Sequence, residues 1–273
     1  MNPSNSRIAF IGGGNMASAI IGGLLKQGLA PAQVAVVEPF AEARARLQQQ
    51  FGVQAQERPD AALGNAGLVV WAVKPQTFKE AAAQARAHVQ QALQLSVAAG
   101  IRSDSIAAWL GTQRIVRAMP NTPALVGKGM TALYARGGAS SADRQRVEQV
   151  IATTGEFLWV DEERQLDAVT ALSGSGPAYV FYFLEAMVQA GSEMGLPEAQ
   201  ARRLAVATFG GASELARAAS EPLQVLRERV TSKGGTTYAA LMSLQGDGVQ
   251  AAFVKALHAA CDRAAELGDE FGR

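Results

Sequence analysis

The sequence is poor in cysteine, histidine and net charge. It has 1 cysteine and 2 histidines in 273 residues, so we expect no disulfide framework and no metal site. The 25 Lys+Arg nearly balance the 24 Asp+Glu, and no basic run is present to bind nucleic acid. No apolar run approaches the roughly 20 residues that span a bilayer, and the N-terminus does not resemble a signal peptide. We therefore expect a globular, cytoplasmic protein that binds neither nucleic acid nor membrane.

The two parts of the chain differ in their sequence pattern. Residues 1–161 alternate short apolar runs with helical stretches, which is typical of a parallel sheet covered by helices on both faces. Residues 162–273 instead form Ala-, Leu-, Glu- and Arg-rich helical segments. We expect an α/β domain over 1–161, doubly wound around a mainly parallel sheet, and an all-α domain over 162–273. The expected strands are 7–12, 33–38, 68–73, 93–98 and 114–119, with edge strands at 129–134 and 156–160.

A glycine-rich turn follows the first expected strand. Gly12, Gly14 and Ala17 fit the pattern G-x-G-x-x-G/A at a strand–helix junction. In this pattern Gly12 permits a tight turn, Gly14 lets the backbone approach a pyrophosphate, and Ala17 allows close helix–strand packing. The N–H groups that begin at Asn15 and Met16 then face the phosphates at the positive end of the helix. Glycines also mark ordinary turns, but this context favours a Rossmann-type dinucleotide-binding domain.

The residue that ends the second expected strand normally contacts the adenosine ribose. Glu38 stands there, and its carboxylate would accept from the 2′-OH of NAD and repel the 2′-phosphate of NADP. Arg44 and Arg46 follow on the next helix, as phosphate ligands or as solvated surface charge. The cofactor is therefore NADPH or NADH, with the preference left open.

Four further segments are rich in glycine, proline and hydroxyl groups. They are AVKP at 72–75, RAMPNTP at 117–123, SGSGPAY at 173–179 and VTSKGGTT at 230–237. With the glycine-rich turn they occur in the order and spacing of one family over essentially the whole chain. The sequence resembles the pyrroline-5-carboxylate reductases, which reduce the C=N bond of Δ1-pyrroline-5-carboxylate to L-proline.

The resemblance implies a Rossmann domain that binds NAD(P)H and a helical C-terminal domain that forms a homodimer, often assembled to a decamer. A broad apolar stripe around Tyr179, Phe183 and Met187 agrees with a core or subunit interface on those helices. The sequence departs from the family at Lys233, where proline is common, and at Gln245, where an acidic residue is usual. These changes bear on loop rigidity and local charge more than on activity.

The 230–237 segment supplies what a substrate carboxylate requires. Gly234 and Gly235 lead with exposed N–H groups into a helix that begins at Thr236, a suitable anion site. By the resemblance, the hydroxyl of Thr237 is the catalytic group that binds the ring nitrogen, and Ser232 and Thr236 hold the carboxylate. The alternative is that Thr236 only caps its helix.

The resemblance also places residues beside the nicotinamide. Ala72, Val73, Lys74 and Pro75 follow a strand at the carboxyl edge of the sheet, where α/β folds bind ligands. Asn121 is expected nearby. Lys74 is alternatively a surface charge.

Two rival functions remain at this stage. A β-hydroxyacid dehydrogenase would need a lysine just past the domain boundary, and none occurs between residues 161 and 232. A non-enzymatic NAD(P) sensor would not need the 232–237 loop. A six-membered cyclic imine differs from the five-membered one by one methylene, which a pocket discriminates by only about 1–3 kcal/mol.

Overall fold

The computed structural model describes residues 7–272. It divides into two compact units. Unit 1 runs to Ser175 and resumes at Ala260, and unit 2 is Gly176–Ala259. The domain boundary at residue 161 stays a prediction. The compact units are instead divided after Ser175 and after Ala259.

Unit 1 is built on one eight-stranded sheet in the order β3-β2-β1-β4-β5-β6-β7-β8. All neighbouring strands are parallel except β6 and β7, which are antiparallel. The expected fold class is confirmed, and the two-residue strand β3 is an addition that the sequence did not predict. The strands are β1 (Arg7–Ile11), β2 (Val34–Val37), β3 (Ala55–Gln56), β4 (Ala66–Trp71), β5 (Leu93–Ser96), β6 (Ile115–Met119), β7 (Gly129–Ala135) and β8 (Gly155–Trp159).

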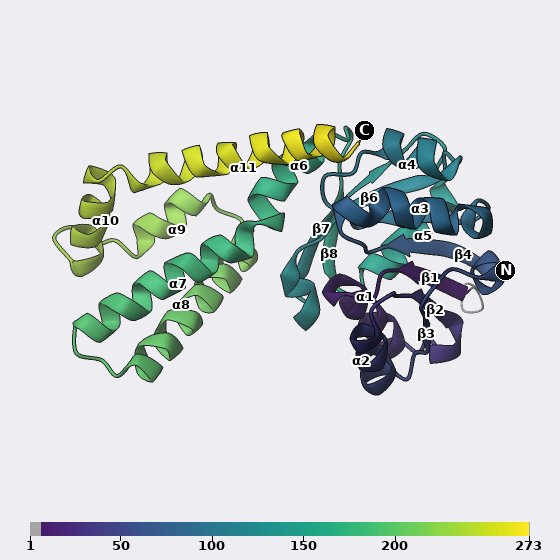
Figure 1. Cartoon of the computed structure of the whole chain (residues 1–273). Coiled ribbons are helices and arrows are strands. Elements are labelled where there is room, and N and C mark those ends of the chain that lie inside the picture. The colour runs from purple at the N-terminus through teal and green to yellow at the C-terminus, as the bar shows by residue number, and fades with distance from the viewer. Residues whose placement is uncertain (1–6, 273) are drawn as a thin grey trace. The chain divides into compact units, whose positions relative to one another are not determined.

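Helices cover both faces of this sheet (Figure 1). Side chains alternate along each strand, so Phe10 packs with α1, α2 and α5, whereas Ile11 packs with α3 and α4 on the other face. The helical elements of unit 1 are α1 (Asn15–Lys26), η2 (Pro31–Gln33), α2 (Ala41–Phe51), η3 (Ala61–Asn65), α3 (Pro75–Val89), α4 (Ser103–Leu110), η4 (Thr122–Val126), α5 (Ser141–Ile151), α6 (Gln165–Val169) and the π-helical turn η5 (Thr170–Gly174).

All the regular secondary structure described in unit 2 is helical. Its helices are α7 (Gly176–Glu193), α8 (Glu198–Ala218), α9 (Leu223–Arg229), α10 (Thr236–Gly246) and the first part of α11 (Val249–Phe271). Few of its side chains are buried, and Leu204 and Phe181 are 57% and 59% exposed. Within residues 7–272, no helix is long and apolar enough to cross a membrane.

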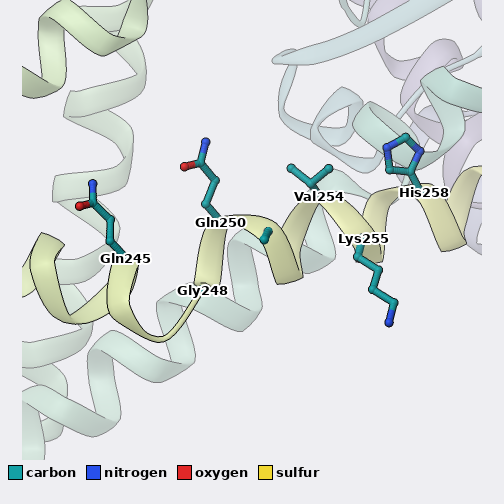
Figure 2. Close-up of a pocket in the computed structure, with 7 residues that line it drawn as sticks. Gln245, Gly248, Gln250, Val254, Lys255 and His258 are labelled. Carbon is teal, nitrogen blue, oxygen red and sulfur yellow. The ribbon is translucent and has the colours of Figure 1, made fainter.

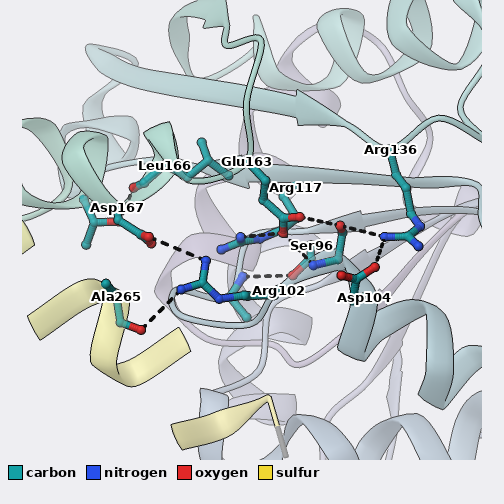
Figure 3. A network of polar contacts seen from close by, with 12 residues as sticks. Ser96, Arg102, Asp104, Arg117, Arg136, Glu163, Leu166, Asp167 and Ala265 are labelled. Atoms are coloured by element: carbon teal, nitrogen blue, oxygen red, sulfur yellow. Dashed lines mark hydrogen bonds and ion pairs between the residues drawn. The ribbon is translucent and has the colours of Figure 1, made fainter. Parts of the chain in front are cut away.

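A polar network fastens the chain after β8 to the sheet (Figure 3). Arg117 on β6 is buried, and its guanidinium donates to Glu163 at 2.7 Å. The same carboxylate accepts from the backbone N–H and the hydroxyl of Ser103, each at 2.6 Å. Burial lowers the pKa of Arg117 from its ordinary value, and Glu163 opposes part of that change. A buried cation is thus matched by a carboxylate from a segment far along the chain.

The end of α11 joins unit 1 through a neighbouring part of this network. Arg102 lies 3.6 Å from the carboxylate of Asp167 and 3.3 Å from that of Asp269. Figure 3 also shows Arg102 bonded to the carbonyl of Ala265 on α11. Burial raises the pKa of Asp167. These contacts explain why the residues from Ala260 onward pack with the α/β unit.

Candidate functional site

A cavity of about 930 Å³ lies at the carboxyl ends of β1, β2 and β4. The strand order reverses between β1 and β4, and open α/β sheets bind ligands at such a switch point. Residues from both sides of that point line the cavity, together with residues of the β1–α1 turn and of the start of α2. The lining residues are Ile11, Gly12, Gly14, Val37, Glu38, Pro39, Phe40, Ala41, Glu42, Ala43, Arg46, Glu57, Pro59, Ala72, Val73, Lys74, Thr77, Glu80, Ala81 and Gln84.

Gly12 and Gly14 shape the wall formed by the β1–α1 turn. Gly12 has a φ of +97°, and a Cβ built on it would lie 2.5 Å from the carbonyl oxygen of Ala72. Only glycine fits this position, because it allows positive φ and leaves room for the neighbouring strand. Gly14 has an ordinary φ of −75° and no atom within 4 Å of a built Cβ. The space beside Gly14 therefore opens toward the cavity rather than toward the core.

The first backbone N–H groups of α1 have no capping side chain. Gly14 is its N-cap and provides no side-chain hydrogen bond to the helix. The N–H groups of Asn15 and Met16 lie at the positive end of the helix dipole, and no side chain caps them. Together with the open space at Gly14, this arrangement fits the pyrophosphate of a dinucleotide.

Lys74 stands where β4 gives way to α3. Its backbone caps α3, with Pro75 at the first helical position, and its carbonyl accepts from the hydroxyl of Thr77 at 3.1 Å. Among the described residues its ammonium group has no hydrogen-bond or ion-pair partner. Lys74 thus contributes an unpaired cation to the cavity wall.

Glu38 lies at the carboxyl end of β2, as expected, and is 6% exposed. Its two carboxylate oxygens accept from the N–H groups of Gly13, at 2.7 Å, and Phe40, at 2.9 Å. Arg44 donates to the carbonyl oxygens of Glu38 and Pro39, at 2.9 and 2.7 Å. Glu38 and Arg44 therefore both hold the loops at this edge of the cavity.

Asn121 does not line the cavity. Its side-chain amide donates to the carbonyl and the hydroxyl of Ser173, both at 3.2 Å, and accepts from the N–H of Met130 at 2.9 Å. These bonds join the end of β6, the start of β7 and the turn η5. Asn15, Met16 and Pro75 are also outside the cavity lining, while the other expected cofactor residues belong to it.

The expected substrate residues lie together in unit 2, in the loop before α10 and its first turn. Gly234 has a φ of +75°, and the N–H of Gly235 donates to the carbonyl of Ser232 at 3.0 Å. Gly235 is the N-cap of α10 and makes no side-chain cap, so Thr236 does not cap the helix through its hydroxyl. Thr237 is half-buried in the first turn. The N-terminus of an 11-residue helix is thereby left with free donors.

Several residues that line the cavity belong to none of the sequence motifs described above. Thr77, Glu80, Ala81 and Gln84 follow the spacing i, i+3, i+4, i+7 on α3 and so share one helix face. That spacing was a usable signal, because α3 starts at the carboxyl edge of the sheet. Phe40 carries no such signal, and its exposed ring follows from the fold of the β2–α2 loop.

A second hollow of about 640 Å³ lies on α10 and α11 in unit 2 (Figure 2). Figure 2 shows that Lys255 points away from Val254 and His258, so the polar groups do not converge. No group of three or more His, Cys, Asp or Glu side chains in residues 7–272 is placed to hold a metal ion.

Comparison with known proteins decides the family. Residues 163–267 match the family model for pyrroline-5-carboxylate reductase dimerisation, and residues 7–100 match that for NADP oxidoreductase, coenzyme F420-dependent. The chain is 45% identical over 273 residues to the pyrroline-5-carboxylate reductase of Pseudomonas aeruginosa, covering 99% of this chain and 100% of that protein. The chain belongs to the pyrroline-5-carboxylate reductase family. As such it is an NAD(P)H-dependent oxidoreductase.

Solved structures agree with this assignment. A pyrroline-5-carboxylate reductase from Coxiella burnetii has a TM-score of 0.87 and 36% identity, covering 96% of this chain and 98% of that one. The Plasmodium falciparum pyrroline carboxylate reductase, solved with NADP bound, has a TM-score of 0.88 and 26% identity, covering 97% and 99%. The match to the dimerisation family model supports a homo-oligomer for this chain.

Proposed function

We propose that this chain reduces Δ1-pyrroline-5-carboxylate to L-proline with NADPH or NADH, the last step of proline biosynthesis. The observation that carries the proposal is the dinucleotide-type cavity at the switch point of a chain that matches the Pseudomonas aeruginosa reductase from end to end. The sensor alternative makes a different prediction, because a sensor would bind the cofactor without consuming it.

The proposed cofactor site is the cavity of unit 1. The glycine turn and the first N–H groups of α1, from Asn15 and Met16, bind the pyrophosphate by hydrogen bonds and the helix dipole. The β4–α3 junction, Ala72 to Pro75, lies on the nicotinamide side, with the ammonium of Lys74 facing the cavity. Asn121 acts from the end of β6, where its amide holds the neighbouring loops through hydrogen bonds.

The proposed substrate site is the loop that precedes α10. A carboxylate binds at the N–H groups of Gly234 and Gly235, where the helix dipole favours an anion. Ser232 and Thr236 add hydroxyl donors, and Thr237 is the catalytic hydroxyl that bonds the ring nitrogen. A hydroxyl is a suitable group here because it donates to or accepts from nitrogen without a charge of its own.

The chemistry asks little of the protein beyond orientation and charge. When bound, NAD(P)H supplies a hydride from C4 of its nicotinamide ring. The protonated imine accepts that hydride at its carbon and becomes the secondary amine of proline, so atoms and charge balance. The protein residues hold the ring and the carboxylate in one orientation, and such positioning contributes a large part of the rate acceleration.

Replacing Thr237 with alanine is expected to lower kcat/KM by about 10- to 100-fold, or about 1.4–2.7 kcal/mol, since one hydrogen bond to the reacting ring is lost. The measurement is steady-state kinetics with Δ1-pyrroline-5-carboxylate. Thr231→Ala is the matched control, because the hydroxyl of Thr231 donates to the carbonyl of Arg227 within its own segment. Kinetics that are equal for the two variants would remove Thr237 from the site.

The assembly proposed is a homodimer through the helices of unit 2, with further assembly to a decamer. In support, apolar side chains of unit 2 are left in the open, among them Leu215 at 71% exposed and Tyr182 at 70%. An exposed apolar surface of this extent marks a protein interface. Light scattering of the purified protein measures the subunit number.

The proposed activity is tested by mixing the protein with Δ1-pyrroline-5-carboxylate and either cofactor, and following the loss of the reduced-nicotinamide absorbance together with proline. Oxidation with stoichiometric proline supports the reductase. Cofactor binding without oxidation supports the sensor, and faster turnover of a six-membered imine acid would change the substrate. A cytoplasmic location is part of the proposal, since the reaction draws on the cytoplasmic NAD(P)H pool, and cell fractionation tests it.

A further inference from the structure

The carboxylate of Glu38 accepts hydrogen bonds from the backbone of two different loops. One oxygen accepts from Gly13 in the β1–α1 turn at 2.7 Å, and the other accepts from Phe40 in the β2–α2 loop at 2.9 Å. The side chain is buried, so both bonds are sheltered from water. Hydrogen bonds from N–H groups to a buried carboxylate are among the stronger ones in proteins. Glu38 thus ties the phosphate-binding turn to the end of β2.

The middle glycine of the turn makes room for this tie. A Cβ on Gly13 would lie 2.7 Å from the Cδ1 of Leu47 and 3.3 Å from the Cβ and the Cγ of Glu38. The general pattern G-x-G tolerates any residue at this position. The glycine found here is explained by the close approach of Glu38 and Leu47, and not by the cofactor.

Arg46 is the cation on the side of the cavity formed by α2. It lines the cavity and is exposed, and among the described residues it has no hydrogen-bond or ion-pair partner. Arg44 differs, because its guanidinium bonds the carbonyls of Glu38 and Pro39, pairs with Glu57 and does not line the cavity. The α2 side of such a cavity, next to the end of β2, is where a Rossmann-type domain holds the adenosine ribose. Arg46 is therefore free to bind a phosphate on that ribose, and Arg44 is not.

We propose that Glu38 is a positioning residue that fixes the glycine turn for either cofactor, and that Arg46 sets the choice in favour of the 2′-phosphate of NADPH. This rests on the proposed function only in taking the cavity as the NAD(P)H site. A carboxylate that acts through the turn affects NADPH and NADH equally, because both carry the same pyrophosphate. A guanidinium that bonds a 2′-phosphate affects NADPH alone.

The test measures the Kd of NADPH and of NADH by quenching of tryptophan fluorescence, with no imine substrate present. For Glu38→Gln we expect both Kd values to rise by a similar factor of about ten, the loss typical of one charge-assisted hydrogen bond. The ratio of the two Kd values stays as in the wild type, because both cofactors carry the same pyrophosphate.

For Arg46→Ala we expect the Kd of NADPH to rise about tenfold or more and that of NADH to stay within about twofold. Lys26→Ala is the matched control: it removes one exposed positive charge at the end of α1, outside the cavity lining, and should change neither value. Because Arg46 is exposed, its variant folds even where a buried Glu38 variant does not.

Two results would overturn the inference. One is a change in the ratio of the two Kd values of Glu38→Gln in favour of NADPH, which would mean that the carboxylate contacts the 2′ position directly. The other is an equal loss of both cofactors in Arg46→Ala. Failure of the proposed function looks different, since the wild-type chain would then bind neither nucleotide, or would bind both and reduce no imine.

Discussion

Replacing Gly12 with alanine is expected to weaken the binding of NADPH and NADH by about a hundredfold or more, roughly 2.7 kcal/mol. Gly12 has a φ of +97°, which costs an L-residue about 1–3 kcal/mol, and the new Cβ would lie 2.5 Å from the backbone oxygen of Ala72. Ala72 directly follows the central strand β4, and its N–H donates to the carbonyl of Ile11 at 2.8 Å, so its backbone is held in place and the turn must move. The phosphate-binding N–H groups would move with it.

Gly14→Ala separates the two roles of glycine in this turn. Its φ of −75° suits alanine, and a Cβ there meets no atom within 4 Å. We expect the free energy of unfolding to stay unchanged while both cofactors bind more weakly, because the methyl group occupies space that the pyrophosphate needs. Fluorescence titration and urea unfolding measure the two quantities. Full nucleotide affinity in Gly14→Ala would mean that the phosphates bind elsewhere.

Glu163→Ala is expected to destabilise unit 1 by about 3–5 kcal/mol, the usual cost of leaving a buried charge without its partner. Glu163 accepts from the buried guanidinium of Arg117 and twice from Ser103 at the start of α4. Without this carboxylate, the guanidinium remains buried between apolar strands and loses its hydrogen-bond partner. Burial lowers the pKa of Arg117, because it removes water from the charged guanidinium.

Urea unfolding followed by tryptophan fluorescence is suited to this measurement, because Trp71, Trp109 and Trp159 all lie in unit 1. Glu162→Ala is the matched control. Glu162 pairs with Arg164 on the surface, where an ion pair contributes about 0–1 kcal/mol. Equal midpoints for the two variants would show that Arg117 is solvated in some other way.

The strands and the glycine turn were predictable because they depend on local patterns. The apolar run that overlaps β4 and the glycine triplet that begins at Gly12 can be identified from the local sequence alone. The strand ends were less predictable: β4, for example, spans Ala66–Trp71, whereas the apolar pattern indicated 68–73. The missed strand β3 has two residues, too few to show an alternation of side chains.

The contacts made by charged and amide side chains were not predictable. Asn121 follows β6 and Glu38 follows β2, as the strand pattern indicates, but their hydrogen bonds go to Ser173 and Gly13, far away in sequence. No periodicity encodes which backbone group a buried side chain reaches, because that depends on how loops from different strands meet. The same is true of the end of α11, whose contact with Arg102 brings it to unit 1.

The central claim is that this chain moves a hydride from its nicotinamide cofactor to the carbon of a cyclic imine. The most direct test uses NADPH with deuterium at both C4 hydrogens, Δ1-pyrroline-5-carboxylate and the wild-type protein, with the product examined by mass spectrometry and NMR. We predict L-proline heavier by one deuterium, located on the ring carbon that is bonded to nitrogen and does not carry the carboxylate. Proline without deuterium, or oxidised cofactor without proline, would contradict the account.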